Sequence, residues 1–426
     1  MRRRADARRE SLPLWGQRSG DKRKCGGPSL SAEGPAEPRP PRKSGRRPRR
    51  VSDFGVLIGL GVANHVVLAG SRIAVSLDAL DRGANAATVG LLLALYAVLP
   101  ALFAIPAGRL ADRIGVRRPM LAGSCGLAVG AALPLLFPGL SSLFVTAVLI
   151  GVSFMTFQVG TQYATGEMGG PDRRVRNFGL LALGYSTSSI VGPLLVGFGI
   201  DHAGFRATFA LLGLLPLIPV FFLGTDRLAL PGPHPAHTAH PLSRALDLVA
   251  HAELRRVFVI NGLISMAWEL HTIFVPIYGN SIGLSASMIG LILAAFASAT
   301  FTVRLAMPLI ARRLTEHQVL TAALFIAGAV YIAFPFSRNV ATLMTLSFCL
   351  GIGLGSGQPM VMALLHSHAP PGRMGEAAGV RMSLINSMAV AVPLAFGAFG
   401  SAFGLAPVLW SVGVCLTTGG WLTRRA

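Results

Sequence analysis

Long apolar segments alternate with short polar connections along most of the chain. From residue 53 onward, runs of about 20 mainly apolar residues recur, and each is long enough for a helix to cross roughly 30 Å of hydrocarbon. The pattern predicts an all-α integral membrane protein with about 12 transmembrane helices. Their expected limits are 54–77, 87–108, 119–137, 141–164, 177–200, 204–224, 257–279, 286–310, 318–336, 340–364, 375–399 and 405–423.

The two halves of this pattern match each other at a shift of two hundred residues. The segment TVGLLLALYA at 88–97 aligns without gaps with MIGLILAAFA at 288–297. Gly, Pro, Gln and Arg residues coincide as well, which apolar composition alone does not produce. We therefore expect two six-helix halves in parallel orientation, related by a pseudo-twofold axis along the membrane normal. The coinciding pairs are Gly151 with Gly351, Gln158 with Gln358, Pro171 with Pro371, Arg173 with Arg373, Gly179 with Gly379, Pro193 with Pro393, Gly197 with Gly397 and Gly204 with Gly404.

Four segments follow from this pattern. Residues 53–224 and 257–426 are expected to form the two bundles, and residues 225–256 the linker between them. Residues 1–52 form a basic arm, with about sixteen Lys or Arg among the first fifty residues and no helical or strand periodicity, so we expect disorder. We expect the arm to be dispensable. A contact with anionic lipid and a reading frame that begins too far upstream are the alternatives.

Overall composition supports a membrane protein. The chain is 52% hydrophobic and 13% charged, whereas a soluble chain carries about 25% charged residues. The formal net charge of +20 would suggest nucleic acid in a soluble domain, but the arm supplies much of this excess. We therefore expect a lipid bilayer as the partner and no nucleic acid.

Arginine is distributed unequally between the two sets of connections. One set, which includes the connections near residues 109–118, 165–176 and 225–256, is rich in arginine, while the other holds only Arg82, Arg206 and Arg338. The positive-inside rule places the arginine-rich set and both termini in the cytoplasm. The expected location is therefore a bacterial cytoplasmic (inner) membrane, crossed many times.

One arginine-rich connection, GRLADRIGVRRPM at 108–120, contains glycine, aspartate and arginine at a specific spacing, beyond the positive charge that the positive-inside rule requires. Its spacing resembles the loop signature of the major facilitator superfamily (MFS), a family of secondary transporters with twelve helices. The resemblance implies that the loop acts as a latch, with Asp112 contacting the start of the eleventh helix near 375–381; a loop needed only for membrane insertion is the alternative. The second copy, PLIARRLTEH, has Arg312 where Asp112 stands in the first. The expected gating residues are Gly108, Asp112, Arg113, Gly115, Arg117 and Arg118, with Arg304 and Arg381 near the cytoplasmic helix ends.

A second motif, GYSTSSIVGPLLVG at 184–197, lies in the fifth span. Its small residues permit close packing of helices in lipid. The motif resembles the fifth-helix signature of proton-driven exporters in the same superfamily, although Val196 stands where that signature has glycine. It favours export modestly over ordinary packing. The packing residues are Gly184, Gly192, Pro193 and Gly197.

Several polar side chains fall within the apolar spans, where an ionisable group is costly and marks a candidate site. Glu269 is the first of these, since a carboxylate near the bilayer centre could load and release a proton; a structural ion pair is the alternative. His271 is either a buried structural histidine or a cavity residue, and Arg72 either binds an anion or extends to the interface. The superfamily resemblance implies that helices one, four, seven and ten line a cavity. The candidate cavity residues are Asn64, His65, Arg72, Gln158, Gln162, Glu269, His271 and Gln358.

These features predict a secondary transporter that moves a small organic solute by alternating access, coupled to protons, with efflux slightly favoured. An uptake permease of the same fold and a receptor or scaffold without transport activity are the alternatives. No GxxxxGK, HExxH or GxSxG motif is present, so we expect neither an ATP-driven pump nor an enzyme. We expect no cofactor and no metal site, and a monomer.

Overall fold

The computed structural model describes residues 51–168, 170, 173–225, 228–232, 248–310, 312–369 and 374–424. Inside these ranges, nothing is described of the side chains at 51–52, 104–109, 111–112, 174–175 and 374–376. The chain divides into two units, Met1–Arg46 and Arg47–Ala426. The predicted basic arm up to residue 50 lies outside the described residues, as do residues 226–227 and 233–247 of the predicted linker.

The described part of the second unit is helical. The first half of the chain forms α1 (Val51–Asp81), α2 (Ala86–Ile114), α3 (Arg117–Leu136), α4 (Leu140–Glu167), α5 (Arg174–Leu214) and α6 (Leu217–Gly224). The second half forms α8 (Ala252–Ser281), α9 (Ala286–Ile310), α10 (Glu316–Ala333), the short 3₁₀ helix η2 (Phe334–Phe336), α11 (Val340–His368), α12 (Met374–Phe403) and α13 (Leu405–Arg424).

Eleven helical segments in the described residues are long and apolar enough to cross a membrane, and one of them accounts for two of the predicted spans. That segment, Arg176–Gly224, has 49 residues, which at about 1.5 Å per residue is more than twice the thickness of the hydrocarbon core. Gly204 interrupts it with a φ of 79° and a ψ of 173°, a conformation that glycine adopts without steric cost. The predicted spans 177–200 and 204–224 therefore meet at this kink.

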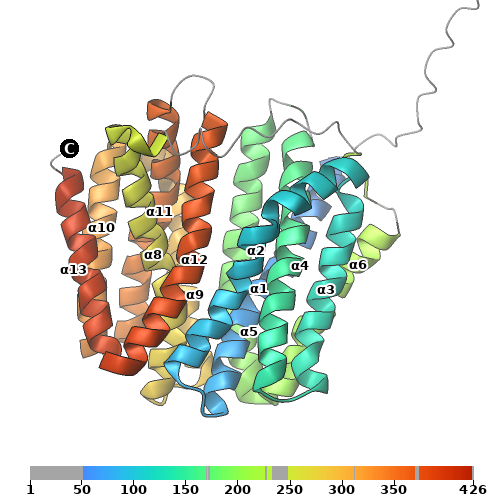
Figure 1. The fold of residues 1–426 in the computed structure, drawn as a ribbon, viewed down its shortest axis with the longest axis horizontal. Coiled ribbons are helices and arrows are strands. Elements are labelled where there is room, and N and C mark those ends of the chain that lie inside the picture. The colour runs from blue at the N-terminus through green and yellow to red at the C-terminus, as the bar shows by residue number, and fades with distance from the viewer. Residues whose placement is uncertain are drawn as a thin grey trace, which may run out of the picture. The chain divides into compact units, whose positions relative to one another are not determined.

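The internal repeat of the sequence is also a repeat of the structure. Gly404, two hundred residues after Gly204, has a φ of 84° and separates α12 from α13. A Cβ built on Gly151 of α4 would collide with the carbonyl oxygen of Tyr96 in α2, and one built on Gly351 of α11 would collide with that of Phe296 in α9. Equivalent helices thus make equivalent contacts, which confirms the two pseudo-symmetric halves. In Figure 1 the first half runs from blue to green and the second from yellow to red, with α2 and α12 side by side between them.

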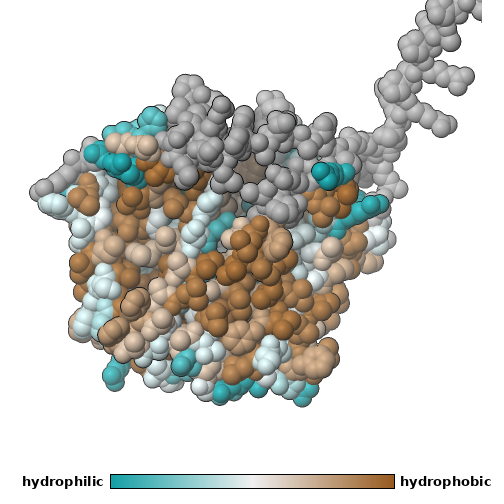
Figure 2. All heavy atoms as spheres, in the orientation of Figure 1, coloured by the Kyte–Doolittle hydropathy of each residue, from teal (hydrophilic) through white to brown (hydrophobic). Residues whose placement is uncertain are grey.

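The outer surface of the described helices fits a lipid environment. Large apolar side chains are exposed on many helices, among them Leu102, Phe137, Leu214, Phe336 and Phe403, which are 60–74% exposed. Figure 2 shows a broad apolar band across the middle of the visible face, with hydrophilic residues gathered toward its two ends. A soluble monomer rarely exposes so large an apolar surface. This surface and the helical architecture confirm the predicted integral membrane fold.

Candidate functional site

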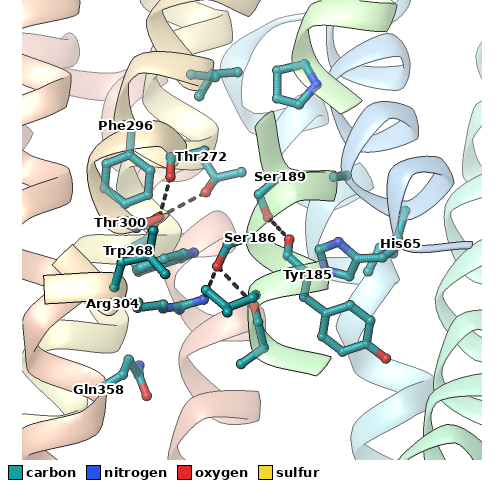
Figure 3. A pocket seen from close by; sticks show the side chains of 18 of the residues that line it. His65, Tyr185, Ser186, Ser189, Trp268, Thr272, Phe296, Thr300, Arg304 and Gln358 are labelled. Carbon is teal, nitrogen blue, oxygen red and sulfur yellow. Dashed lines mark hydrogen bonds between the residues drawn. The ribbon is translucent and has the colours of Figure 1, made fainter. Parts of the chain in front are cut away.

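A cavity of about 880 Å³ lies between the two halves. Its walls come from α1 and α5 of the first half and from α8, α9 and α11 of the second (Figure 3). The lining reaches the first turns of α5, at Arg176 and Gly179, and the last turn of α9, at Pro308. These helix ends belong to the same side as the arginine-rich connections, and we call this side the arginine-rich end. The cavity therefore extends from the middle of the bundle toward that end.

At the opposite side, which we call the closed end, the two halves touch. A Cβ built on Gly290 of α9 would lie 2.5 Å from the carbonyl oxygen of Pro193 in α5, and the symmetric pair Gly90 and Pro393 is packed as closely. A Cβ on Gly197 would lie 2.5 Å from the carbonyl oxygen of Ala286. Small residues here let two helix backbones meet, and this contact separates the cavity from the closed end.

A carboxylate adds a polar contact at the closed end. Asp201 of α5 accepts hydrogen bonds from the backbone N–H groups of Ala286, at 3.0 Å, and of Ser287, at 2.8 Å, and also from the Ser287 hydroxyl. Ala286 begins α9 in the second half. The first N–H groups of a helix have no partner within it, and negative charge is favourable there. Asp201 thus adds a cap from the other half to α9, whose own neighbour Ser285 accepts from the backbone N–H of Met288 at 3.4 Å.

An ion pair connects the halves beside the cavity. A terminal nitrogen of Arg72 in α1 lies 2.8 Å from Oε2 of Glu269 in α8, and these side chains are 19% and 13% exposed. Arg72 lines the cavity, whereas Glu269 is not among the lining residues. Each charge offsets the cost of burying the other, so that loss of one leaves the other uncompensated. The two candidates that the sequence singled out separately therefore act as a pair.

Two histidines line the cavity from opposite halves. His65 Nδ1 is 2.6 Å from Ser188 Oγ, and its ring stacks on Tyr185 with centroids 4.7 Å apart. His271 Nε2 is 3.1 Å from Ser347 Oγ, and its ring stacks on Phe296 at 4.3 Å. Its Nδ1 has no hydrogen-bond partner among the described residues. Each ring is therefore held by a serine on one edge and by an aromatic face.

Two arginines that the sequence places near the gate lie at or beside the cavity. Arg304 of α9 is one of the lining residues, and it donates a hydrogen bond to the Ser186 hydroxyl of α5 (Figure 3). Arg381 of α12 donates to the side-chain oxygen of Gln358, which also lines the cavity. Arg304 thus connects the two halves through Ser186, as the Arg72–Glu269 pair does at another level.

Other predicted cavity residues lie elsewhere. Asn64 is fully buried and donates from Nδ2 to Ser124 Oγ of α3 at 2.9 Å. Gln158 and Gln162 of α4 are not among the lining residues, and Gln162 is exposed. Helix α4 contributes no lining residue, while α5 and α9 contribute many. The cavity therefore differs from the four-helix lining that the superfamily resemblance implies.

The α5 face is the part of the site that the sequence analysis missed. Ala182, Tyr185, Ser186, Ser189 and Pro193 all line the cavity, and their spacing of three to four residues places them on one face of a helix. From the sequence, this motif is expected to pack helices closely and, by its resemblance to an exporter signature, to favour export, but a cavity-lining role is not expected for it. The packing prediction is correct for the other face, because a Cβ built on Gly184 would lie 3.0 Å from Ile58, and one on Gly192 would lie 3.2 Å from Gly70.

The predicted gating loop is described in part. Gly115 has a φ of 81° and ends α2, as a turn there requires. Arg117 donates to the backbone oxygens of Leu223, at 2.9 Å, and of Leu228, and so fastens the start of α3 to the end of α6. Arg113 and Arg118 are exposed. The surroundings of Gly108 and the side chain of Asp112 are not described. The latch therefore stays a prediction.

Comparisons with known proteins agree with this architecture. Residues 57–393 match the family described as the Major Facilitator Superfamily. The chain is 29% identical over 342 residues to the tetracycline resistance protein, class G, of Vibrio anguillarum, covering 77% of this chain and 84% of that protein. It is 28% identical over 352 residues to the class C protein of Escherichia coli, covering 80% and 87%. It is 23% identical over 337 residues to the multi-drug resistance efflux pump PmrA of Streptococcus pneumoniae, covering 77% and 83%.

Solved structures show the same fold. A POT family transporter in complex with a thioalcohol-conjugated peptide superposes with a TM-score of 0.74 at 14% identity, covering 88% of this chain and 95% of that chain. The peptide transporter POT in complex with sulfate gives 0.73 at 16% identity, covering 89% and 96%. The family match covers well over half of the chain. This chain therefore belongs to the Major Facilitator Superfamily of membrane transporters, as the loop signature predicted.

Proposed function

We propose that this protein is a secondary transporter that exports a small organic solute by alternating access and couples the export to protons. The observation that carries the proposal is the Arg72–Glu269 ion pair, which joins α1 to α8 across the two halves beside the cavity. The cavity would hold the solute, and the contact at the closed end would separate the solute from the other side of the membrane. Solute enters the cavity from the arginine-rich end, which the positive-inside rule assigns to the cytoplasm.

Alternating access requires two packings of the halves that differ little in free energy. In the present state the closed end is held by glycine contacts, such as that of Gly290 with Pro193, and by the Asp201 cap. Separation of the halves at this end and approach at the other would expose the same cavity to the outside. Rocking of one bundle against the other around a fixed site is the motion that this architecture allows.

The ion pair gives protons a way to bias this motion. Protonation of Glu269 removes its negative charge and the charge component of the contact between α1 and α8. A ligand, including a proton, shifts a conformational equilibrium by the difference between its affinities for the two states. Because the pair holds the halves together more strongly when both groups are charged, protonation favours the state in which these helices separate. Glu269 is therefore the proposed proton carrier, with His65 and His271 next in line.

The relatives support the direction of transport. The three relatives described above, at 23–29% identity, are named as tetracycline resistance proteins or as a multi-drug efflux pump. The Gly-Pro motif of α5 also resembles that of exporters. Both features favour export over the uptake alternative.

The test is transport by full-length protein in liposomes with an imposed pH gradient, using tetracycline together with a panel of anionic, neutral and cationic aromatic compounds. Glu269→Gln imitates the protonated carboxyl at nearly the same size. We expect this variant to insert, to exchange solute across the membrane, and to lose accumulation driven by the gradient, because no proton can be cycled at this position.

A matched control lies on the same helix. Glu253 pairs with Arg256 at 3.4 Å, and these side chains are 59% and 56% exposed. Glu253→Gln should leave gradient-driven transport unchanged, since exposed pairs contribute little. Full gradient-driven accumulation by Glu269→Gln would make the ion pair structural. Background flux of protons and of all solutes in the unaltered protein would favour the scaffold alternative.

A further inference from the structure

The charges that line the cavity do not balance. Its charged lining residues in the described part of the chain are Arg72, Arg176 and Arg304, and no Asp or Glu is among the lining residues. Glu269, which is not among the lining residues, neutralises Arg72. Arg176 is exposed at the arginine-rich end of the cavity. Arg304 remains as a positive charge on the wall, less than two turns before the end of the membrane-spanning helix α9.

The Arg304 guanidinium has no charged partner in the part of the chain that the structure describes. It donates to the Ser186 hydroxyl, and no carboxylate oxygen of the described residues lies within the 4.0 Å of an ion pair. A guanidinium carries five N–H donors in a planar fork that fits a carboxylate with two parallel hydrogen bonds. Figure 3 shows the side chain extending from α9 toward α5, with Trp268 beside it. An arginine in a membrane span is expensive and is usually functional when it faces a wet cavity.

The wall around Arg304 is apolar and aromatic. Trp268 and Phe296 line the cavity and pack edge to face, with ring centroids 4.8 Å apart. Leu293, Ala297 and Leu305 extend this surface along α9. Ligand cavities of about 300–1,000 Å³ accept drug-sized molecules, and this one, at about 880 Å³, is near the upper limit.

We propose that the transported solute is an amphipathic organic anion whose carboxylate binds Arg304 and whose apolar body packs on Trp268 and Phe296. This inference rests on the proposed transport function and names the substrate class of the same cavity. One lining arginine in the interior of a mainly apolar chamber, without a carboxylate partner among the described residues, matches a single carboxylate better than a multiply charged phosphate. Export of an anion from a cytoplasm at negative potential is also favoured by the membrane field.

Binding to purified full-length protein tests the substrate class. The probes are three sets of isosteric aromatic compounds, each a carboxylate, its amide and the corresponding amine: 2-naphthoate, 4-phenylbutyrate and indole-3-acetate with their derivatives. We expect the carboxylates to bind at least about tenfold more tightly than the amides and amines, as loss of a charge-assisted hydrogen bond predicts. Arg304→Gln should remove this preference, and Arg304→Lys should retain part of it.

Two control variants separate recognition from folding. Arg206→Gln removes an exposed arginine whose hydrogen bond to the backbone oxygen of Leu135 is long, at 3.5 Å, and should not alter binding. Arg338→Gln removes a second exposed arginine, which is not among the cavity-lining residues, and should not alter binding either. Melting temperatures without ligand report whether each variant is folded.

Each outcome of these measurements decides between the proposals. No tighter binding of carboxylates in the unaltered protein, or an undiminished preference in folded Arg304→Gln, would overturn the anion proposal. If the liposomes then carry neutral or cationic members of the panel, the transport function stands and only the substrate class is wrong. If no member is carried and no proton flux is seen, the transport proposal fails as well.

Discussion

At the scale of single residues, neighbouring positions on one helix serve different purposes. His65 lines the cavity, whereas Asn64 beside it is fully buried and donates to Ser124 of α3. Successive residues on a helix point about 100° apart, and a helix of a membrane bundle has neighbours on several sides. A polar residue in such a span therefore faces either a cavity or another helix, and sequence alone does not distinguish these cases.

Substitution of Asn64 tests this difference. Asn64→Ala should destabilise the protein by about 1 kcal/mol, because a buried interhelical hydrogen bond is lost, while solute affinity stays unchanged. His65→Ala, one residue further on, should lower solute affinity because it removes a cavity wall and exposes the face of Tyr185. Thermal unfolding and ligand binding of both variants in detergent separate the two effects. A large loss of solute affinity in a stable Asn64→Ala protein would show that Asn64 contributes to solute binding.

At the scale of helices, the closed end is symmetric in its glycine contacts and asymmetric in its polar contact. Gly90 and Gly290 each meet a proline of the other half. Asp201 caps α9, but the residue two hundred positions later is Ser401, whose hydroxyl donates to the backbone oxygen of Ala398 in its own helix. The polar contact thus holds one side of the closed end only.

Asp201 should therefore stabilise the present state. Asp201→Ala removes a capping carboxylate, a change that costs about 1 kcal/mol, and only the state in which α5 and α9 touch bears this cost. We expect the population open at the closed end to rise about fivefold. Accessibility of a cysteine introduced at Ser189 to a reagent added from that side measures the shift. Ser401→Ala is the control and should leave accessibility unchanged, whereas no change in Asp201→Ala would show that glycine packing alone closes this end.

At the scale of the whole molecule, the sequence was sufficient for the architecture and insufficient for the cavity. The length of the apolar runs and the two-hundred-residue repeat can be read along the chain, and they predicted the helices and the two halves correctly. The cavity depends on how helices from different halves rotate toward each other. For this reason the α5 lining was missed, and the contact between Arg72 and Glu269, 197 residues apart, was not predicted.

The orientation of the molecule decides the direction of transport, and it is the last prediction. Arg313 and Arg338 are both exposed and lie beyond opposite ends of α10. In a protein whose native cysteines are replaced, Arg338→Cys should react with an impermeant maleimide in intact cells, while Arg313→Cys should react only after the membrane is opened. The positive-inside rule requires this result, since the side of Arg313 holds most of the arginines. Because the cavity reaches that same side, the protein would then face the cytoplasm in the present state and be ready to load solute for export. Labelling of Arg313→Cys from outside would show the opposite orientation in the membrane. The same cavity would then be the loading site of an uptake system.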